Sequence, residues 1–386
     1  MSEKAIVNSE VIKWARITAK MSIEEVAAKL PCRPVKIEEW ENDVDYPTIR
    51  QAERLAQIYR RPLAVFYLPS PPKDFETLKD FRRTDKSGEY STALTFIIRD
   101  IQERQIWIRD FLIEQNEDGL SFLGNFSIEN SVNDIANDIK KVLEIEENIG
   151  TDKILKYWID KVESKRIFVS LANNVHTRMK LSIDEVRGFA IYDNVAPFIF
   201  INTEDTENGM LFTLAHELAH IWIKQSGVSN VEFRESNVDF YEPLEVFCNE
   251  VAAELLLPLN MVKDYFKNVK ITIDVIDAFA NKMHVSPFSV SVRLLKNGYI
   301  PTSVFNEYKK IFKERYEKHL ENKLQKKKKQ KGGGDFYRDQ IKKNSRAFTF
   351  LIYDSYREGI VNSYEASSLL HIKINKFAKL ETYLYN

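Results

Sequence analysis

Residues His216–His220 read HELAH and so have the pattern H-E-x-x-H. It lies within Met210–Ile223, a segment that contains no Pro or Gly and whose apolar residues have helical spacing. Residues four apart project from one face of a helix, so both imidazoles can bind one metal ion, and zinc suits imidazole nitrogen. Glu217 then lies beside the pair, where its carboxylate can accept a proton from water. Even the looser pattern His-acidic-x-x-His is expected by chance only roughly 0.01 times in a chain of this composition.

A catalytic zinc ion needs a third protein ligand. No His follows His220 until His284, so a carboxylate is expected in this role. Glu245 starts a second apolar helical segment, and Asn249 lies one turn further on the same face. This spacing lets Glu245 bind the metal while Asn249 forms a hydrogen bond with a ligating imidazole. Three other carboxylates are alternatives to Glu245: Glu250, Glu242 and Asp239.

Two segments resemble the ImmA/IrrE zinc metallopeptidases. They are Phe212–His220 (FTLAHELAH), preceded by Ile199–Asn202, and Glu245–Pro258 (EVFCNEVAAELLLP). The resemblance implies a gluzincin-like site in which His216, His220 and Glu245 bind Zn²⁺ and Glu217 is the catalytic base. It also implies an endopeptidase that cleaves a repressor-type DNA-binding protein in stress, mobile-element or toxin–antitoxin regulation.

The remaining composition predicts an α+β fold that is mainly helical. Gly and Pro number 12 each among 386 residues, about half of ordinary usage. Three β-branched and aromatic runs predict a small sheet: Arg166–Leu171, Val186–Tyr192 and Phe198–Asn202. The last run is either an edge strand that receives a substrate by strand addition or an interior strand.

Changes in composition along the chain predict five parts. We expect an N-terminal five-helix domain at 1–72, a helical connector at 73–130 and the peptidase-like domain at 131–300. A basic helix and the Gly332–Gly334 linker follow at 301–334, and a helical C-terminal domain occupies 335–386. The lysine-rich tract Lys323–Lys331 is expected to be a solvated tether.

The N-terminal part resembles the helix-turn-helix of the XRE/Cro family. Ser22–Leu30, a short turn and Pro34–Asn42 form the pattern. The resemblance implies that Arg33, Val35 and Lys36 face double-stranded DNA at the start of a recognition helix. Two departures leave a protein-interaction module as the alternative: Glu38 and Glu39 add negative charge, and Asp43 stands where the family usually has Gly.

Charge and cysteine content exclude several classes of protein. The 56 basic and 57 acidic residues exclude a globally basic nucleic-acid coat, and two cysteines, Cys32 and Cys248, exclude a disulfide framework. Both cysteines are expected to be small buried residues. No apolar stretch is long enough to span a membrane, so we expect a soluble, cytoplasmic protein with no membrane partner.

Two points of function stay open in the sequence. By residue type alone, His176 and Tyr241 are the candidates for stabilising an oxyanion. A transcription regulator or antitoxin-like protein with a non-catalytic zinc-binding fold is the alternative to an enzyme. The intact H-E-x-x-H favours the enzyme, because a scaffold gains nothing from a base beside a metal ion.

Overall fold

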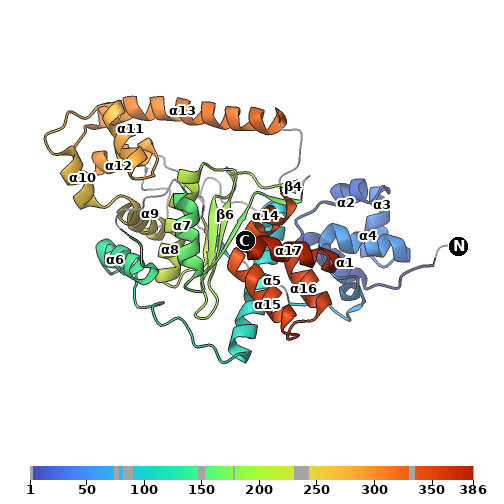
Figure 1. Ribbon diagram of the computed structural model, residues 1–386. Coiled ribbons are helices and arrows are strands. Elements are labelled where there is room, and N and C mark those ends of the chain that lie inside the picture. The colour runs from blue at the N-terminus through green and yellow to red at the C-terminus, as the bar shows by residue number, and fades with distance from the viewer. Residues whose placement is uncertain are drawn as a thin grey trace. The chain divides into compact units, whose positions relative to one another are not determined.

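The computed structural model describes residues 3–73, 78–80, 90–146, 153–176, 179–229, 243–329 and 335–385. As the composition predicted, this part of the chain is mainly helical, with seventeen α-helices and a small mixed sheet. It divides into two compact units (Figure 1). The first consists of residues 1–77, 88–103 and 174–181, and the second of 78–87, 104–173 and 182–386.

The first unit begins with four short α-helices and a 3₁₀ helix: α1 (Ser9–Thr18), α2 (Ile23–Lys29), α3 (Pro34–Glu41), α4 (Ile49–Tyr59) and η1 (Leu63–Tyr67). It also contains the start of α5 (Thr92–Glu114) and the β3–β4 hairpin (Asn174–His176 and Met179–Lys180). The five-helix prediction for residues 1–72 therefore corresponds to four α-helices and the 3₁₀ helix η1.

Local sequence explains where two of these helices start. Ser22 and Glu25 form a capping box at α2, in which each side chain accepts a hydrogen bond from the other residue's backbone N–H. Thr48 and Gln51 form a second one at α4. A partly buried ion pair then ties α1 to the end of α3, because Arg16 donates two hydrogen bonds, at 2.7 and 2.8 Å, to the Glu41 carboxylate.

The second unit holds the sheet and the remaining helices. The helices are the end of α5, α6 (Val132–Leu143), α7 (Ile154–Glu163), α8 (Glu207–Trp222), α9 (Pro243–Leu256), α10 (Leu259–Phe266), α11 (Ile273–Lys282), α12 (Pro287–Lys296), α13 (Thr302–Lys329), α14 (Phe336–Asn344), α15 (Arg346–Arg357), α16 (Ser363–Leu370), η3 (Ile374–Lys376) and α17 (Phe377–Leu384). The strands are β1 (Lys79–Asp80), β2 (Phe168–Ala172), β5 (Gly188–Ile191), β6 (Phe198–Asn202) and β7 (Gly227–Ser229).

The sheet has the strand order β1-β7-β5-β6-β2. Strand β6 pairs in parallel with β2 and antiparallel with β5, so that Ile199 lies opposite both Val169 and Ala190. Helix α8 packs on β5 and β6, whereas α14 and α15 pack on β2. Figure 1 shows α7 and α8 on one side of the sheet and α14 and α15 on the other, so the sheet is covered on both faces.

The structure decides one question about strands that the sequence left open. Phe198–Asn202 is an interior strand with five buried residues, so the alternative of an edge strand open to a substrate fails. None of the three predicted strand runs includes Gly227–Ser229, which forms β7 because it pairs with β5 and β1 from distant parts of the chain. The predicted linker Gly332–Gly334 lies outside the described residues.

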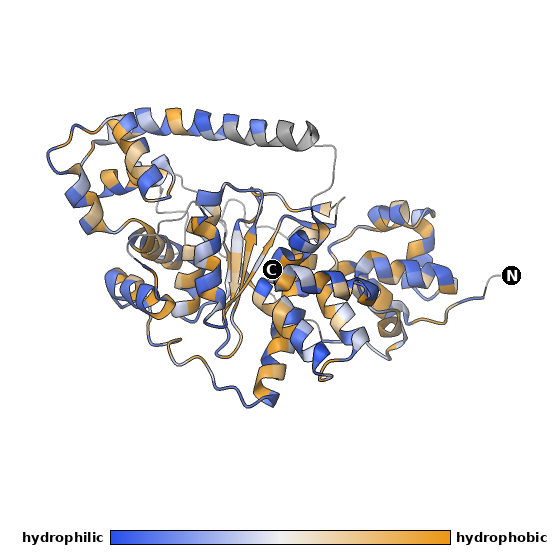
Figure 2. Ribbon diagram, in the orientation of Figure 1, coloured by the Kyte–Doolittle hydropathy of each residue, from blue (hydrophilic) through white to orange (hydrophobic). Residues whose placement is uncertain are grey.

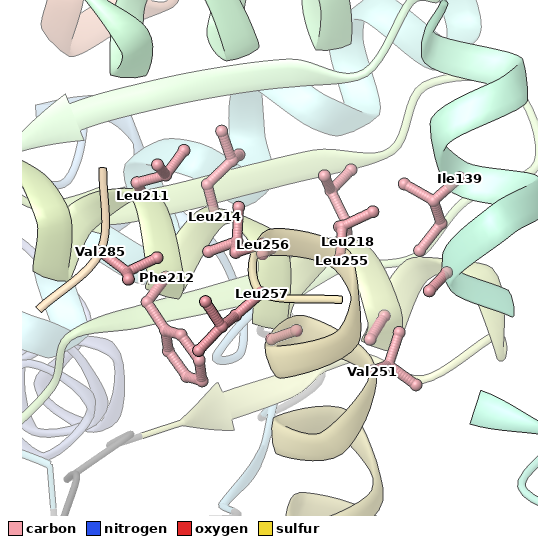
Figure 3. Close-up of a cluster of buried hydrophobic side chains, with 14 of the residues drawn as sticks. Ile139, Leu211, Phe212, Leu214, Leu218, Val251, Leu255, Leu256, Leu257 and Val285 are labelled. Atoms are coloured by element: carbon pink, nitrogen blue, oxygen red, sulfur yellow. The ribbon is translucent and has the colours of Figure 1, made fainter. Parts of the chain in front are cut away.

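The main hydrophobic core joins α8 to its neighbours. Figure 3 shows Leu218 of α8, Val251 and Leu255 of α9, and Ile139 of α6 gathered in one buried cluster. The strands of the sheet are mostly hydrophobic in Figure 2, whereas the coloured part of α13 is mostly hydrophilic. The core therefore surrounds α8 closely and fixes the direction of its side chains.

Candidate metal centre

Two helices provide the candidate site. Helix α8 is capped by Thr206, whose hydroxyl accepts a hydrogen bond from the backbone N–H of Gly209 at 3.1 Å. Every residue from Leu211 to Trp222 is buried, because α8 lies between the sheet and α9. Helix α9 begins at Pro243, a favourable first helical residue, and places Glu245 in its first turn.

His216, His220 and Glu245 lie together and are 0–2% exposed. Nε2 of His216 is 3.0 Å from Nε2 of His220 and 3.3 Å from Oε2 of Glu245. Nε2 of His220 is 3.0 Å from Oε1 of Glu245. Ligand atoms of a tetrahedral ion held at about 2.0–2.1 Å lie roughly 3.3 Å apart, so three converging donors with this spacing fit one divalent metal ion.

The charges in the cluster also suit a cation. Burial lowers the pKa of His220, which favours the neutral imidazole that binds metal. Burial alone would raise the pKa of Glu245, but the neighbouring His216 and His220 outweigh it and lower that pKa to about 2. A buried carboxylate is thus kept ionised beside two nitrogen donors.

Asn249 lies where its spacing from Glu245 predicted. Its Oδ1 is 3.1 Å from Nδ1 of His216, so it accepts a hydrogen bond when Nδ1 carries the proton. That tautomer directs the Nε2 lone pair of His216 toward the cluster. Among the alternative ligands, Glu250 instead pairs with Lys296 at 3.3 Å on the protein surface. Glu242 and Asp239 lie outside the described residues.

Glu217 is fully buried and faces β5. A Cβ atom added at Gly188 would lie 3.0 Å from Oε1 of Glu217 and 2.5 Å from Cγ2 of Thr213. The absence of a side chain at Gly188 therefore lets α8 approach the sheet at the turn that bears Glu217. This contact was not predicted from the sequence, although a lone glycine inside the strand-like run Val186–Tyr192 indicates a close backbone approach.

The residues predicted to bind DNA lie at the start of α3. Arg33 and Val35 are exposed at the start of α3, Val35 by 55%. The ammonium group of Lys36 lies 2.6 Å from Glu39 and 3.4 Å from Asp45, so two carboxylates already compete for it. Asp43 has a φ of 59°, the left-handed conformation in which Gly is common and Asp is tolerated.

The oxyanion assignment stays a prediction. His176 ends β3 in the first unit with an exposed side chain, and Tyr241 lies outside the described residues.

Cys248 is buried on α9, and burial together with the nearby carboxylates of Glu245 and Glu217 raises its pKa. Cys32 is half-buried.

Comparison with known families agrees with this geometry. The peptidase M78 family model, described as the IrrE N-terminal-like domain, matches residues 174–295. A search of curated proteins found no match for the chain. Among the described helices, none is both long and apolar enough to cross a lipid bilayer. The family match supports a metallopeptidase role, and the matched segment, which contains all three clustered side chains, is similar to an IrrE N-terminal-like domain.

Proposed function

We propose that the chain is a zinc-dependent endopeptidase that cleaves a repressor-type DNA-binding protein. The observation that supports it best is the buried group of His216, His220 and Glu245, with Glu217 on the same turn as His216. Two imidazoles and one carboxylate are a common set of protein ligands at catalytic zinc. The assignment of a repressor-type protein as the substrate is inferred from the family resemblance alone.

The residues have separate tasks in this proposal. His216, His220 and Glu245 would hold the ion, which supplies Lewis acidity toward the peptide carbonyl and the attacking water. Asn249 fixes the ring of His216. Glu217 accepts a proton from the attacking water and delivers it to the leaving amine. Packing against Gly188 limits the conformations open to its carboxylate.

The test compares the parent chain with Glu217→Gln and, as a control, Glu250→Gln. Glu250 is a surface carboxylate on α9 that pairs with Lys296, so its loss should leave cleavage unchanged. Each variant is coexpressed with the products of adjacent genes, and fragments are identified by mass spectrometry. We expect fragments from the parent and the control alone. If purified parent and Glu217→Gln both contain zinc and neither cleaves any of these proteins, the enzyme proposal fails, and the non-catalytic regulator remains.

DNA binding by the first unit is a separate proposal. Exposed Arg33 favours it, whereas the two carboxylates around Lys36 disfavour it. Affinity for duplex DNA measured at several salt concentrations decides the matter, because each phosphate contact releases counterions. A measurable affinity whose logarithm falls steeply with the logarithm of salt concentration supports DNA binding. Absent or salt-independent binding leaves the protein-interaction alternative.

A further inference from the structure

A cavity of about 720 Å³ lies in the second unit, and none of its lining residues belongs to the metal centre. Its walls are the end of α5 with the following loop, the end of α7 with the turn into β2, and one face of α15 with the residues just after it. The volume lies within the range of roughly 300–1,000 Å³ that is usual for small-ligand sites.

Part of the wall is apolar and aromatic. The rings of Phe111, Phe168 and Phe350 line it together with Leu351 and Ile360. Phe350 and Ile360 are 36% and 52% exposed. A ligand with an apolar body can therefore bury surface against rings and aliphatic side chains that now contact water.

The charged part of the wall is mainly acidic. Five carboxylates line it, those of Glu117, Asp160, Glu163, Asp354 and Glu358. The cations that line it are two guanidinium groups, Arg166 and Arg346. The lining thus has three more formal negative charges than positive ones when every carboxylate is ionised.

Both guanidinium groups already have partners. Arg166 pairs with Glu117 at 3.1 Å, and Arg346 donates to the backbone carbonyl of Leu384 at 2.6 Å. Asp160 has only a loose ion pair, 3.7 Å long, with exposed Lys156. Within the described residues, the side chain of Glu358 forms no hydrogen bond or ion pair. Asp160 and Glu358 can therefore accept a cation without breaking a close contact.

Glu163 connects this cavity to the C-terminal helices. Its buried carboxylate accepts hydrogen bonds from the Ser345 hydroxyl and from the backbone N–H groups of Val169 and Ala347, the latter two at 3.3 and 3.2 Å. It thereby joins the end of α7 to β2 and to the first turn of α15. A cation near this carboxylate would favour its ionised form, which accepts these bonds more strongly.

We propose that this cavity binds an organic cation, an amine, amidine or guanidinium group attached to an apolar body. The cationic group would bind Asp160 and Glu358, and the apolar body would lie against the Phe111 and Phe350 rings, which also attract a cation through their faces. A free small molecule and a Lys or Arg side chain of a protein partner share this chemistry. The proposal is independent of the proposed peptidase activity.

The test measures binding of three probes to the full chain by isothermal titration calorimetry. They are p-aminobenzamidine, its neutral analogue p-aminobenzamide, and the peptide acetyl-Leu-Arg-Phe-Leu-amide. Since charge-assisted hydrogen bonds contribute about 1.5–3 kcal/mol, we expect the amidine to bind at least about tenfold more tightly than the amide. The peptide distinguishes a protein partner from a free small molecule as the natural ligand. If the peptide binds about tenfold more tightly than the amidine, the ligand is a protein partner; if it binds more weakly than the amidine, the ligand is a free small molecule.

Variants locate the site. The double variant Asp160→Asn/Glu358→Gln should weaken amidine binding about tenfold. Asp264→Asn/Glu307→Gln, which alters two exposed carboxylates outside the cavity, should leave it unchanged. Thermal denaturation checks that both variants fold. The proposal is overturned if neither cationic probe binds, if amidine and amide bind equally, or if the folded Asp160/Glu358 variant binds like the parent.

Discussion

Gly188→Ala tests how closely α8 packs on the sheet. The new methyl carbon would lie 2.5 Å from Cγ2 of Thr213, 2.9 Å from the Phe200 carbonyl oxygen and 3.0 Å from Oε1 of Glu217. All three distances are too short, so α8 and β5 must move apart. Overpacking of this kind costs about 1–3 kcal/mol, and the stiffer unfolded chain returns about 0.4–1 kcal/mol. We expect a net loss of about 1–2 kcal/mol in the free energy of unfolding, measured by urea denaturation.

A matched control and a second substitution sharpen this test. Gly119→Ala places its methyl group 3.5 Å from the nearest atom, the Asn194 carbonyl oxygen, and should change stability by less than about 0.5 kcal/mol. Adding Thr213→Ser to Gly188→Ala removes the methyl group in closest contact and should recover part of the loss. In the parent, the same Thr213→Ser should destabilise by about 1 kcal/mol. If Gly188→Ala unfolds at the same urea concentration as the parent, the close packing inferred here is wrong.

Four further predictions concern the metal centre and two buried carboxylates. Removing bound metal with a chelator should lower the unfolding temperature, and adding Zn²⁺ should restore it; no change in either direction would argue against a metal site. Asn249→Ala should weaken zinc affinity about 10–100-fold in a competition titration, because the ring of His216 loses its hydrogen-bond partner. Burial raises the pKa of Glu163 to about 7 from an ordinary value of 4.5, so the folded protein holds this proton more tightly than the unfolded chain. Stability should therefore fall by up to about 3 kcal/mol as the pH rises from about 4.5 to 7, and Glu163→Gln should flatten this part of the stability profile. Glu41→Ala should destabilise the first unit by about 1.5–3 kcal/mol in denaturant titrations, since the partly buried Arg16 loses two charge-assisted hydrogen bonds, and an unchanged midpoint would refute that role.

Features that depend on nearby residues were predictable from the sequence. The spacing of His216 and His220 on one helix follows from the helical repeat, which links residues four apart. The same repeat placed Glu245 and Asn249 on one face of α9, and the structure brings Glu245 to both imidazoles and Asn249 to that of His216. The start of α2 at its capping residue Ser22 also depends only on neighbouring residues. The metal-binding and catalytic roles of these residues remain predictions.

Features that depend on distant partners became visible only in the tertiary structure. The run Phe198–Asn202 has the same composition whether it lies at an edge or inside a sheet, and its pairing with both β2 and β5 made it interior. Lys36 was predicted to face DNA, and only the fold shows that its ammonium group lies beside the Asp45 carboxylate. The hydrogen bonds of the Glu163 carboxylate to Ser345 and Ala347 likewise depend on α15, which lies far along the chain. Helical spacing depends only on residues that are close together in the sequence. Strand order, ion-pair partners and burial depend on contacts between segments that are far apart in the sequence, and the sequence does not state which of these segments meet.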